Sequence, residues 1–453
     1  MHPVNLLSLD PKDNLYQDQS TSYLVVSGGT GCNGIASAFG SNVTHVLPVS
    51  DNGGSSSEVW DIRSRLIRLI PEAPPASPTE AIRRLLSHRF SVDLTEQQAK
   101  EEWRDLVEGR SPLWKGIPPD RKETIRGFLV YFEGELLRRA HKRFSFRNGS
   151  VGNYFLTAVH LFLRSVPSAI FLFSSITARS PWKAHILPVL VTNHTVTIAA
   201  ELANGSRIIG QCEISHPVAP STPRIVVRSE LDDAPALDEE QDIDDAVGTF
   251  PKSPEHNSLF AKPEQDQGDV PLESRIRRVF YINPYGQEVF PRPNSEFLGG
   301  LRSRDVLVYS VGSLWTSIIP CLALQGVGSA IARSPTLRAK VFLLNAYNDR
   351  ETGGYTGVDY VLAVAETLNR HDGQKSSTQP SFSVTRAPDY PISAFITHLV
   401  YLRGTTIEVD ELALTALGVQ CVPIDPQPND KGKLLYTTGD VKLALARILD
   451  ESD

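Results

Sequence analysis

The sequence predicts an α/β protein built on a doubly wound, mostly parallel Rossmann-like sheet, with a helical insertion and a β-hairpin. Three observations lead to this fold class. Apolar runs of strand length alternate with helical patterns along the chain, as in successive β–α–β units. Several of these runs end in loops rich in glycine and hydroxyl residues. The dipeptide Asn204-Gly205 separates two short strand-like runs, which is a strong hairpin signal.

The first element is a strand at residues 23–26 that leads into a glycine-rich turn over residues 27–34. Glycine can take positive φ and lets an anion approach the backbone, while free N–H groups of the next helix point at it. Asp51 follows a second strand-like run, and three glycines match the G-x-G-x-x-G pattern: Gly29, Gly31 and Gly34. Considered alone, this pattern predicts a dinucleotide-binding domain.

A second loop of small residues follows Asp51, with the sequence Asn52-Gly53-Gly54-Ser55-Ser56-Ser57. A carboxylate that binds ribose does not need such a loop. Two loops of this kind at the ends of neighbouring strands would form adjacent anion cradles, as a diphosphate or a nucleotide with a second phosphorylated substrate would require. The alternative is that both loops are tight turns without a ligand.

Residues 59–147 have helical patterns throughout, and we expect a helical insertion here. Thr95 and Gln98 form a capping box at the start of one helix. A second helix is predicted by apolar residues at helical spacing: Ile125, Phe128, Leu129, Phe132 and Leu136. The aromatic residues of this stripe are expected to be core rather than ligand contacts.

Residues 148–212 predict mixed structure. A Gly/Ser turn opens a helix at Gly152-Asn153, residues 170–173 form a buried strand, and alternating apolar residues over 196–202 pair with a run over 207–214.

Residues 215–272 are rich in Pro, Asp, Glu and Ser. This composition cannot bury enough apolar surface to order the segment, so we expect a disordered acidic loop.

The C-terminal half predicts further strand and helix units. A strand at residues 278–282 marks re-entry into the domain, and residues 305–310 form a buried parallel strand. That strand feeds a third turn and helix, Val311 to Pro320, while residues 340–345 form a strand that ends at Asn345. At least one more αβ unit follows, including a helix at 441–449. We therefore expect a tail over residues 1–21 and a single domain over residues 22–453.

Charge and composition narrow the class of protein. The formal net charge is −7, but residues 230–273 hold fourteen Asp or Glu and two Lys, which leaves the remainder at about +5. That excess is too weak and scattered to indicate nucleic-acid binding, although it suits small anionic ligands. Four widely spaced cysteines indicate a reducing compartment. The N-terminal segment resembles no signal peptide and no run is long and apolar enough to span a membrane, so we expect a cytoplasmic protein without membrane contact.

Six motifs, taken in order, resemble the CofD-like family: Gly28-Gly29-Thr30-Gly31, Asp51-Asn52-Gly53-Gly54-Ser55-Ser56, Asp61-Ile62-Arg63, Gly152-Asn153, the stretch Gly312 to Pro320, and Asn345 with Glu351-Thr352. This family contains the 2-phospho-L-lactate (or phosphoenolpyruvate) transferases of deazaflavin coenzyme biosynthesis and YvcK-type proteins that bind UDP-sugars. The resemblance runs from about residue 23 to residue 370 and, more weakly, to the C-terminus. The acidic insertion is similar to that of eukaryotic, fungal, members.

The resemblance implies that a nucleotide diphosphate lies between the glycine loops. The ligand would be a nucleotide diphosphate-linked small molecule, with a homodimer left open. The catalytic candidates are Asp51 and Asp61, and Asp51 would also be the ligand of a Mg²⁺ ion. The candidate nucleotide- and phosphate-binding residues are Gly28, Gly29, Thr30, Gly31, Asn52, Gly53, Gly54, Ser55, Ser56, Gly152, Asn153, Gly312, Ser313, Thr316, Ser317 and Asn345.

This sequence departs from the family pattern at two points. The family has an acidic pair where this chain has Asp51-Asn52, and a longer stretch where only residues 57–60 separate the serine-rich loop from Asp61.

Three candidate functions are consistent with the same loops. The first is a transferase that moves a phospholactyl- or phosphoenolpyruvyl-type group, the second is a non-catalytic nucleotide-sugar sensor, and the third is an NAD-dependent oxidoreductase. The second glycine loop and the lack of an evident acid/base pair for hydride transfer argue against the third.

Overall fold

The computed structural model describes residues 21–28, 31–49, 66–67, 74, 77–138, 144–177, 185–192, 196–215, 271–372, 389–429 and 432–451. The predicted N-terminal tail, the loop that begins at Asp51 and most of the predicted acidic loop lie outside these ranges.

The centre of the fold is a parallel sheet, and its strands in spatial order are β11 (Gln420–Ile424), β10 (His398–Leu402), β9 (Ala339–Leu343), β8 (Val306–Tyr309), β1 (Tyr23–Val26), β2 (Val43–Leu47) and β3 (His185–Pro188). Each neighbouring pair is parallel. The chain builds outward from β1 to β3, returns to the centre at β8, and then builds outward to β11. This order is that of a doubly wound Rossmann-like sheet, so the predicted fold class is confirmed.

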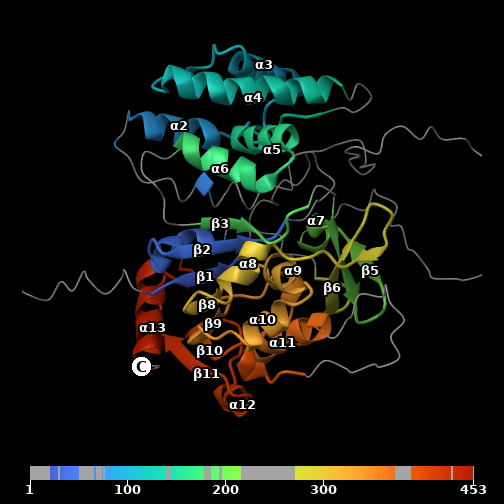
Figure 1. The fold of residues 1–453 in the computed structure, drawn as a ribbon, viewed down its shortest axis with the longest axis vertical. Helices are drawn as coiled ribbons and strands as arrows, with labels where there is room; N and C mark the ends of the chain where they lie inside the picture. Colours follow the sequence, from blue (N-terminus) through green and yellow to red (C-terminus); the bar gives the residue numbers. More distant parts are fainter. Residues whose placement is uncertain are drawn as a thin grey trace, which may run out of the picture.

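Helices cover both faces of the sheet, which explains why its strands are apolar throughout (Figure 1). On one face, η2 (Gly31–Phe39) packs beside α13 (Thr438–Asp450), over alternate strand residues such as Val25 and Val308. The opposite face is covered by α8 (Ser295–Gly300), η5 (Leu314–Ile318), α9 (Ile319–Leu322), α10 (Val327–Ala332) and α11 (Gly357–Asp372). The outer αβ unit adds η7 (Ile392–Ala394) and α12 (Glu411–Ala416).

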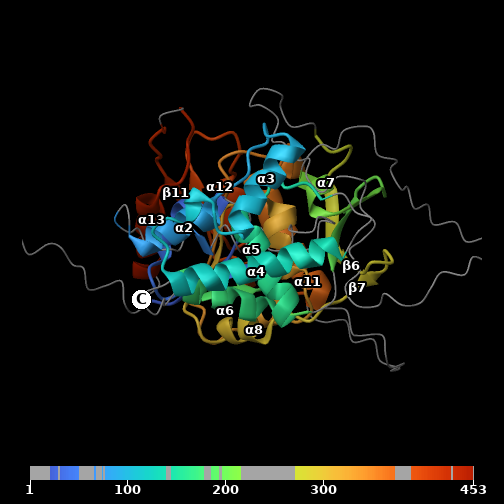
Figure 2. The same ribbon diagram turned by 90° about the horizontal axis from the view of Figure 1, so that it is seen from above.

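A helical layer lies beyond the β3 edge of the sheet (Figure 1). It consists of α2 (Pro78–Ser87), α3 (Glu96–Val107), η4 (Pro112–Trp114), α4 (Pro119–Leu137), α5 (Val151–Leu163) and α6 (Val166–Thr177). Viewed from above, α4 crosses α5 and α6 (Figure 2). The capping box at Thr95 and the helix that contains Ile125 are confirmed.

Two expectations for this part of the chain are wrong. Residues 170–173 lie in α6 rather than in a strand, because buried residues recur at helical spacing around them: Val166, Ala169, Ile170, Phe173 and Ile176. A short apolar run alone cannot separate the two structures. The return to mixed structure also comes later than residue 148, since α5 and α6 pack on the other helices of the layer.

A second, antiparallel sheet flanks the helices α9 and η5. Its strand order is β5 (Arg207–Ile209), β4 (Thr197–Leu202), β6 (Ile276–Ile282) and β7 (Glu288–Val289). The predicted hairpin is β4 and β5, and Gly205 in its turn has φ +86°. The returning strand ends at Ile209 rather than at residue 214, because Gly210 takes φ +95° and begins the short helix α7 (Gln211–Ser215).

Candidate functional site

The turns after β1 and β8 meet at the point where the strand order reverses. In open α/β sheets, the carboxyl ends of the strands at such a switch point are the usual place for a ligand. A Cβ atom on Gly28 would lie 2.6 Å from Cβ of Ser317, and one on Gly31 would lie 3.2 Å from Cα of Gly312. The two turns are therefore in direct contact, and glycine is what allows their backbones to approach so closely.

Asn345, at the end of β9, holds the turn after β8 in place. Its Oδ1 accepts a hydrogen bond from the backbone N–H of Gly312 at 3.1 Å, and its Nδ2 donates to the carbonyl of the same residue at 2.8 Å. Gly312 has φ +146°, a conformation that other residues rarely adopt. Asn345 thus fixes the backbone of Gly312 through both its N–H and its carbonyl.

Glu351, in η6 (Arg350–Thr352), is the buried carboxylate beside this turn. Its Oε2 accepts from the backbone N–H groups of Trp315 and Thr316, at 3.0 and 3.1 Å. Its Oε1 accepts from the hydroxyls of Thr316 and Ser215, at 2.6 and 2.7 Å. Burial, and next the charge of Asp349, raise the pKa of Glu351 to about 7. Both oxygens are therefore occupied by protein donors.

The predicted site residues around η5 have distinct surroundings. Thr316 uses its N–H and its hydroxyl on Glu351, while Ser317 packs against Gly28 and donates its N–H to the carbonyl of Ser313. Ser310, at the end of β8, is buried, and its hydroxyl has no hydrogen-bond partner among the described residues. The structure therefore brings Gly28, Gly31, Gly312, Ser313, Thr316, Ser317 and Asn345 together. Their binding roles remain predictions.

Gly152 and Asn153 lie in the first turn of α5, whose main contacts are with α2, α4 and α6. The structure does not place them in a described contact with the turns after β1 and β8. Asn153 is only 1% exposed, and within the described part of the chain neither its Oδ1 nor the Oγ of Ser150 has a hydrogen-bond partner. Unsatisfied buried oxygens at a helix N-terminus are compatible with a polar ligand that would donate to them.

The remaining predicted site residues lie outside the described ranges: Gly29, Thr30, Asp51, Asn52, Gly53, Gly54, Ser55, Ser56 and Asp61. The described residues contain no group of three or more His, Cys, Asp or Glu side chains that could hold a metal ion. Both oxygens of Glu351 are taken up by four protein donors, and the predicted Mg²⁺ ligand, Asp51, lies outside the described ranges.

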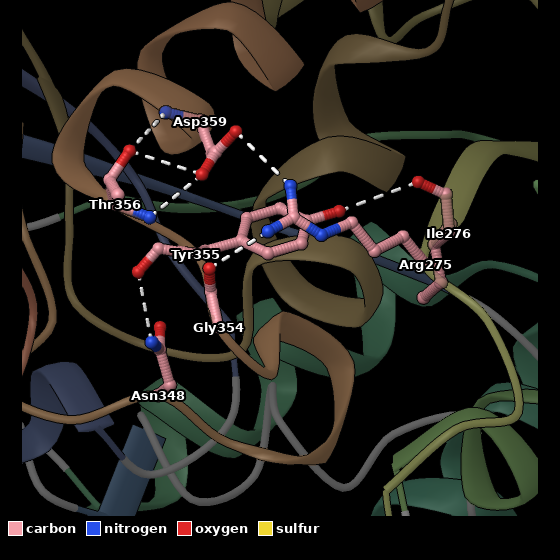
Figure 3. A network of polar contacts seen from close by, with 7 residues as sticks. All are labelled: Arg275, Ile276, Asn348, Gly354, Tyr355, Thr356 and Asp359. Atoms are coloured by element: carbon pink, nitrogen blue, oxygen red, sulfur yellow. Dashed lines mark hydrogen bonds and ion pairs between the residues drawn. The ribbon is translucent and has the colours of Figure 1, made fainter.

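The loop after β9 is held to the second sheet by Arg275 (Figure 3). The guanidinium of Arg275 lies over the ring of Tyr355, 4.9 Å from its centroid, and donates to the carbonyl of Gly354 at 2.8 Å. It also pairs with Asp359, whose second oxygen accepts the N–H and the hydroxyl of Thr356. Glu351 lies in the same segment, a few residues before Gly354. The contacts of Arg275 and Asp359 therefore fix the C-terminal end of the segment that carries Glu351.

Sequence reasoning did not find the roles of Glu351, Ser215 and Arg275. Glu351 was part of a recognised motif, but nothing in the sequence links it to the N–H groups of residues 315 and 316 or to a hydroxyl 136 positions away. Such pairs are created by the packing of η5, η6 and α7, for which a single sequence carries no local signal.

Strand order, glycine turns and the switch point define a Rossmann-like α/β protein. The family described as 2-phospho-L-lactate transferase CofD matches residues 24–421. A protein of Saccharomyces cerevisiae, "Uncharacterized protein YNL011C", is 34% identical over 432 residues, which are 88% of this chain and 94% of that protein. The chain belongs to the CofD family.

Other relatives are more local or more distant. The "Gluconeogenesis factor" of Bacillus subtilis is 35% identical over 100 residues, 22% of this chain and 28% of that protein. The "Gluconeogenesis factor" of Halalkalibacterium halodurans is 38% identical over 93 residues, 20% of this chain and 27% of that protein. The crystal structure of protein BH3568 from Bacillus halodurans covers 94% of this chain and 99% of its own, with a TM-score of 0.57 and 18% identity, and so supports the fold.

None of the helices in the described ranges combines the length and the apolar character needed to cross a lipid bilayer.

Proposed function

We propose that this protein is a CofD-type transferase that moves a phospholactyl- or phosphoenolpyruvyl-type group from a nucleotide diphosphate-linked donor to an acceptor hydroxyl. The observation that carries the proposal is the contact at the switch point of the sheet, where the turns after β1 and β8 meet through Gly28 and Gly312. The family match over residues 24–421 supports the same reaction type.

The proposed chemistry is attack of an acceptor oxygen on the donor's outer phosphorus. A new phosphorus–oxygen bond forms, the bond to the diphosphate's bridging oxygen breaks, a nucleoside monophosphate leaves, and the acceptor proton passes to solvent. Such transfer depends on positioning and charge neutralisation more than on a covalent nucleophile. In this proposal backbone N–H groups of the Gly28–Gly31 turn and of the loop after Asp51 would hold the diphosphate, and Asp51 would hold a Mg²⁺ ion that neutralises phosphate charge.

A second candidate is a regulatory protein that binds a nucleotide sugar without consuming it. The two local relatives named gluconeogenesis factor favour it, because their matches cover 93 and 100 residues at 38% and 35% identity. The same site would serve both functions, so binding alone cannot distinguish them.

Asp51→Asn distinguishes the two candidates. The amide is isosteric with the carboxylate, so a transferase should keep nucleotide affinity within about tenfold, while losing the charge that a magnesium ion needs. The best ligand is first identified by thermal shift with nucleotides and nucleotide sugars, with and without Mg²⁺; a ligand at about 100 times its dissociation constant adds about 2.7 kcal/mol of stability.

The wild type and the variant are then incubated with that ligand and a pool of cell-extract acceptors, and the nucleotide is followed by mass spectrometry. The expected result is magnesium-dependent product from the wild type and none from Asp51→Asn. Binding that does not need magnesium, with no product in any pool, would favour the sensor and remove the transferase.

A further inference from the structure

The carboxylate of Glu351 links three segments that are distant in the sequence. It receives the first N–H groups of η5 through Trp315 and Thr316, and it receives the hydroxyl of Ser215 from α7. The hydroxyls of Ser215 and Thr316 are also 3.0 Å apart. The side chain is only 2% exposed, so this set of contacts is closed to solvent.

The segment that Glu351 holds is the one that touches the first glycine turn. Ser317 follows Thr316 directly, and its Cβ lies where a side chain on Gly28 would have to go. The N–H of Ser317 donates to the carbonyl of Ser313, so residues 313–317 form one compact unit. A shift of the η5 N-terminus would therefore move the surface against which Gly28 and Gly31 pack.

We propose that Glu351 is a positioning residue of the nucleotide site: it takes up the N–H groups at the start of η5 and thereby holds the turn after β8 against the turn after β1. The inference rests on the proposed function. Thr316 gives both its N–H and its hydroxyl to Glu351, so this residue belongs to the positioning contact.

The charge of Glu351 provides a readout that a purely structural contact would lack. An ionised carboxylate accepts all four hydrogen bonds, whereas a protonated one must turn one oxygen into a donor. Asp349 of the same segment is the charged group that acts on it, and Tyr360 of α11 contacts the neighbouring Thr352. η5 contains no ionisable side chain, and in α7 the charged residue is the exposed Glu213.

Two substitutions separate shape from charge. Glu351→Met keeps the length of the side chain but removes every acceptor, whereas Glu351→Gln keeps an oxygen for the two N–H groups and an amide that can donate to the two hydroxyls. Asp359→Asn is the matched control, because Asp359 holds the far end of the same loop through Thr356 and Arg275. Circular dichroism checks that each variant is folded.

Hydrogen exchange at the amides of Trp315 and Thr316, and titration with the nucleotide selected by thermal shift, are measured at pH 6 and pH 8. Loss of a hydrogen bond to a charged group predicts roughly tenfold or faster exchange and about tenfold or weaker binding in Glu351→Met. Glu351→Gln should recover most of the binding. The ratio of wild-type to Gln affinity should rise from pH 6 to pH 8, a comparison that cancels the nucleotide's own titration.

Each result supports or overturns the inference. If Glu351→Met is folded and binds as the wild type does, or if Asp359→Asn weakens binding as much as Glu351→Met does, Glu351 has no positioning role. If the wild type binds no nucleotide, the proposed function fails instead, and the positioning role in the site fails with it. In that case the exchange data still test Glu351 itself. If the amides of Trp315 and Thr316 remain protected from hydrogen exchange in Glu351→Met, Glu351 has no structural role at η5 either.

Discussion

At the scale of single residues, the closest contact of the site is between Gly28 and Ser317. We expect Gly28→Ala to destabilise the protein by about 1–3 kcal/mol, because the new Cβ would lie 2.6 Å from Cβ of Ser317 and the two turns would have to separate. Gly34→Ala is the control. Nothing lies within 4 Å of a Cβ at Gly34, and alanine there should be neutral or stabilising by up to about 1 kcal/mol.

Urea denaturation of the two variants measures this difference. Ser317→Gly provides a further check, since it removes the two nearest atoms that the Gly28→Ala methyl would meet and leaves only Cα of residue 317 at 3.0 Å. The double variant should recover part of the stability lost in Gly28→Ala. Equal stability of Gly28→Ala and Gly34→Ala would show that the turns are not in the contact described.

Glu351 makes stability depend on pH in a defined direction. Its pKa is about 7 in the folded protein against 4.5 in an exposed chain, so the folded state holds a proton that the unfolded state has lost between these values. The stability contributed by this proton is complete below about pH 4.5 and is lost as the pH rises through 7. The loss is on the order of 3 kcal/mol.

Urea denaturation of the wild type and of Glu351→Gln at several pH values tests this direction. The wild type should lose stability relative to the Gln variant as the pH rises from 5 to 8. Two parallel stability curves would mean that Glu351 does not titrate in this range.

The sequence predicted the glycine turns but not the reason why Gly28 must be glycine. The reason is Ser317, almost 300 residues later, whose Cβ and Oγ would lie 2.6 and 2.8 Å from a Cβ on Gly28, and residue spacing carries no information about that contact. Asn345 is a partial exception. Its place at the end of a predicted strand identified it, but its two bonds to Gly312 required the order of β8 and β9.

At the scale of elements, helix ends were predictable where their signals are local. Thr95 caps α3 by accepting from the N–H of Gln98, and the side chain of Gln98 returns a bond to the N–H of Thr95. Thr95→Ala should cost about 1 kcal/mol. Thr124→Ala is the control, because Thr124 is exposed within α4 and donates its hydroxyl to the carbonyl of Asp120. Thermal denaturation should show a lower midpoint for the first variant only.

Elements whose signals are not local were harder to predict. α6 was mistaken for a strand because residues 170–173 are all apolar, and the evidence for a helix is the spacing of buried residues on both sides of them. The β4–β5 hairpin was correct because Asn204-Gly205 fixes a turn by itself. The parallel strands were recognised from their apolar runs, but the sequence analysis did not predict their spatial order, which depends on contacts between distant segments.

At the scale of the whole molecule, the predicted acidic loop leaves and rejoins the described chain close to the candidate site. Ser215, on the N-terminal side of the loop, contacts Glu351, while Arg275, on the C-terminal side, contacts Gly354 three residues further along the same segment. The backbone of Arg275 also accepts the N–H of Ala203 beside β4. The two ends are therefore fixed independently of what lies between them.

This arrangement predicts that most of the acidic loop can be removed. Deletion of residues 225–268 leaves a short connection, and shortening a loop about fivefold lowers its closure cost by only about 1.4 kcal/mol. The removed segment is rich in Asp and Glu and poor in aromatic residues, so it offers little apolar surface to a core. We expect the melting temperature to change by less than about 2 °C.

Differential scanning calorimetry of the full chain and the deletion variant measures the change. Ser215→Ala in the full chain is the control, because it removes a hydrogen bond to Glu351 and leaves the loop intact. A deletion that lowers the melting temperature more than Ser215→Ala does would show that the loop packs on the domain. An unchanged melting temperature with altered nucleotide binding would instead show that the loop acts at the site, through the two anchored ends beside Glu351.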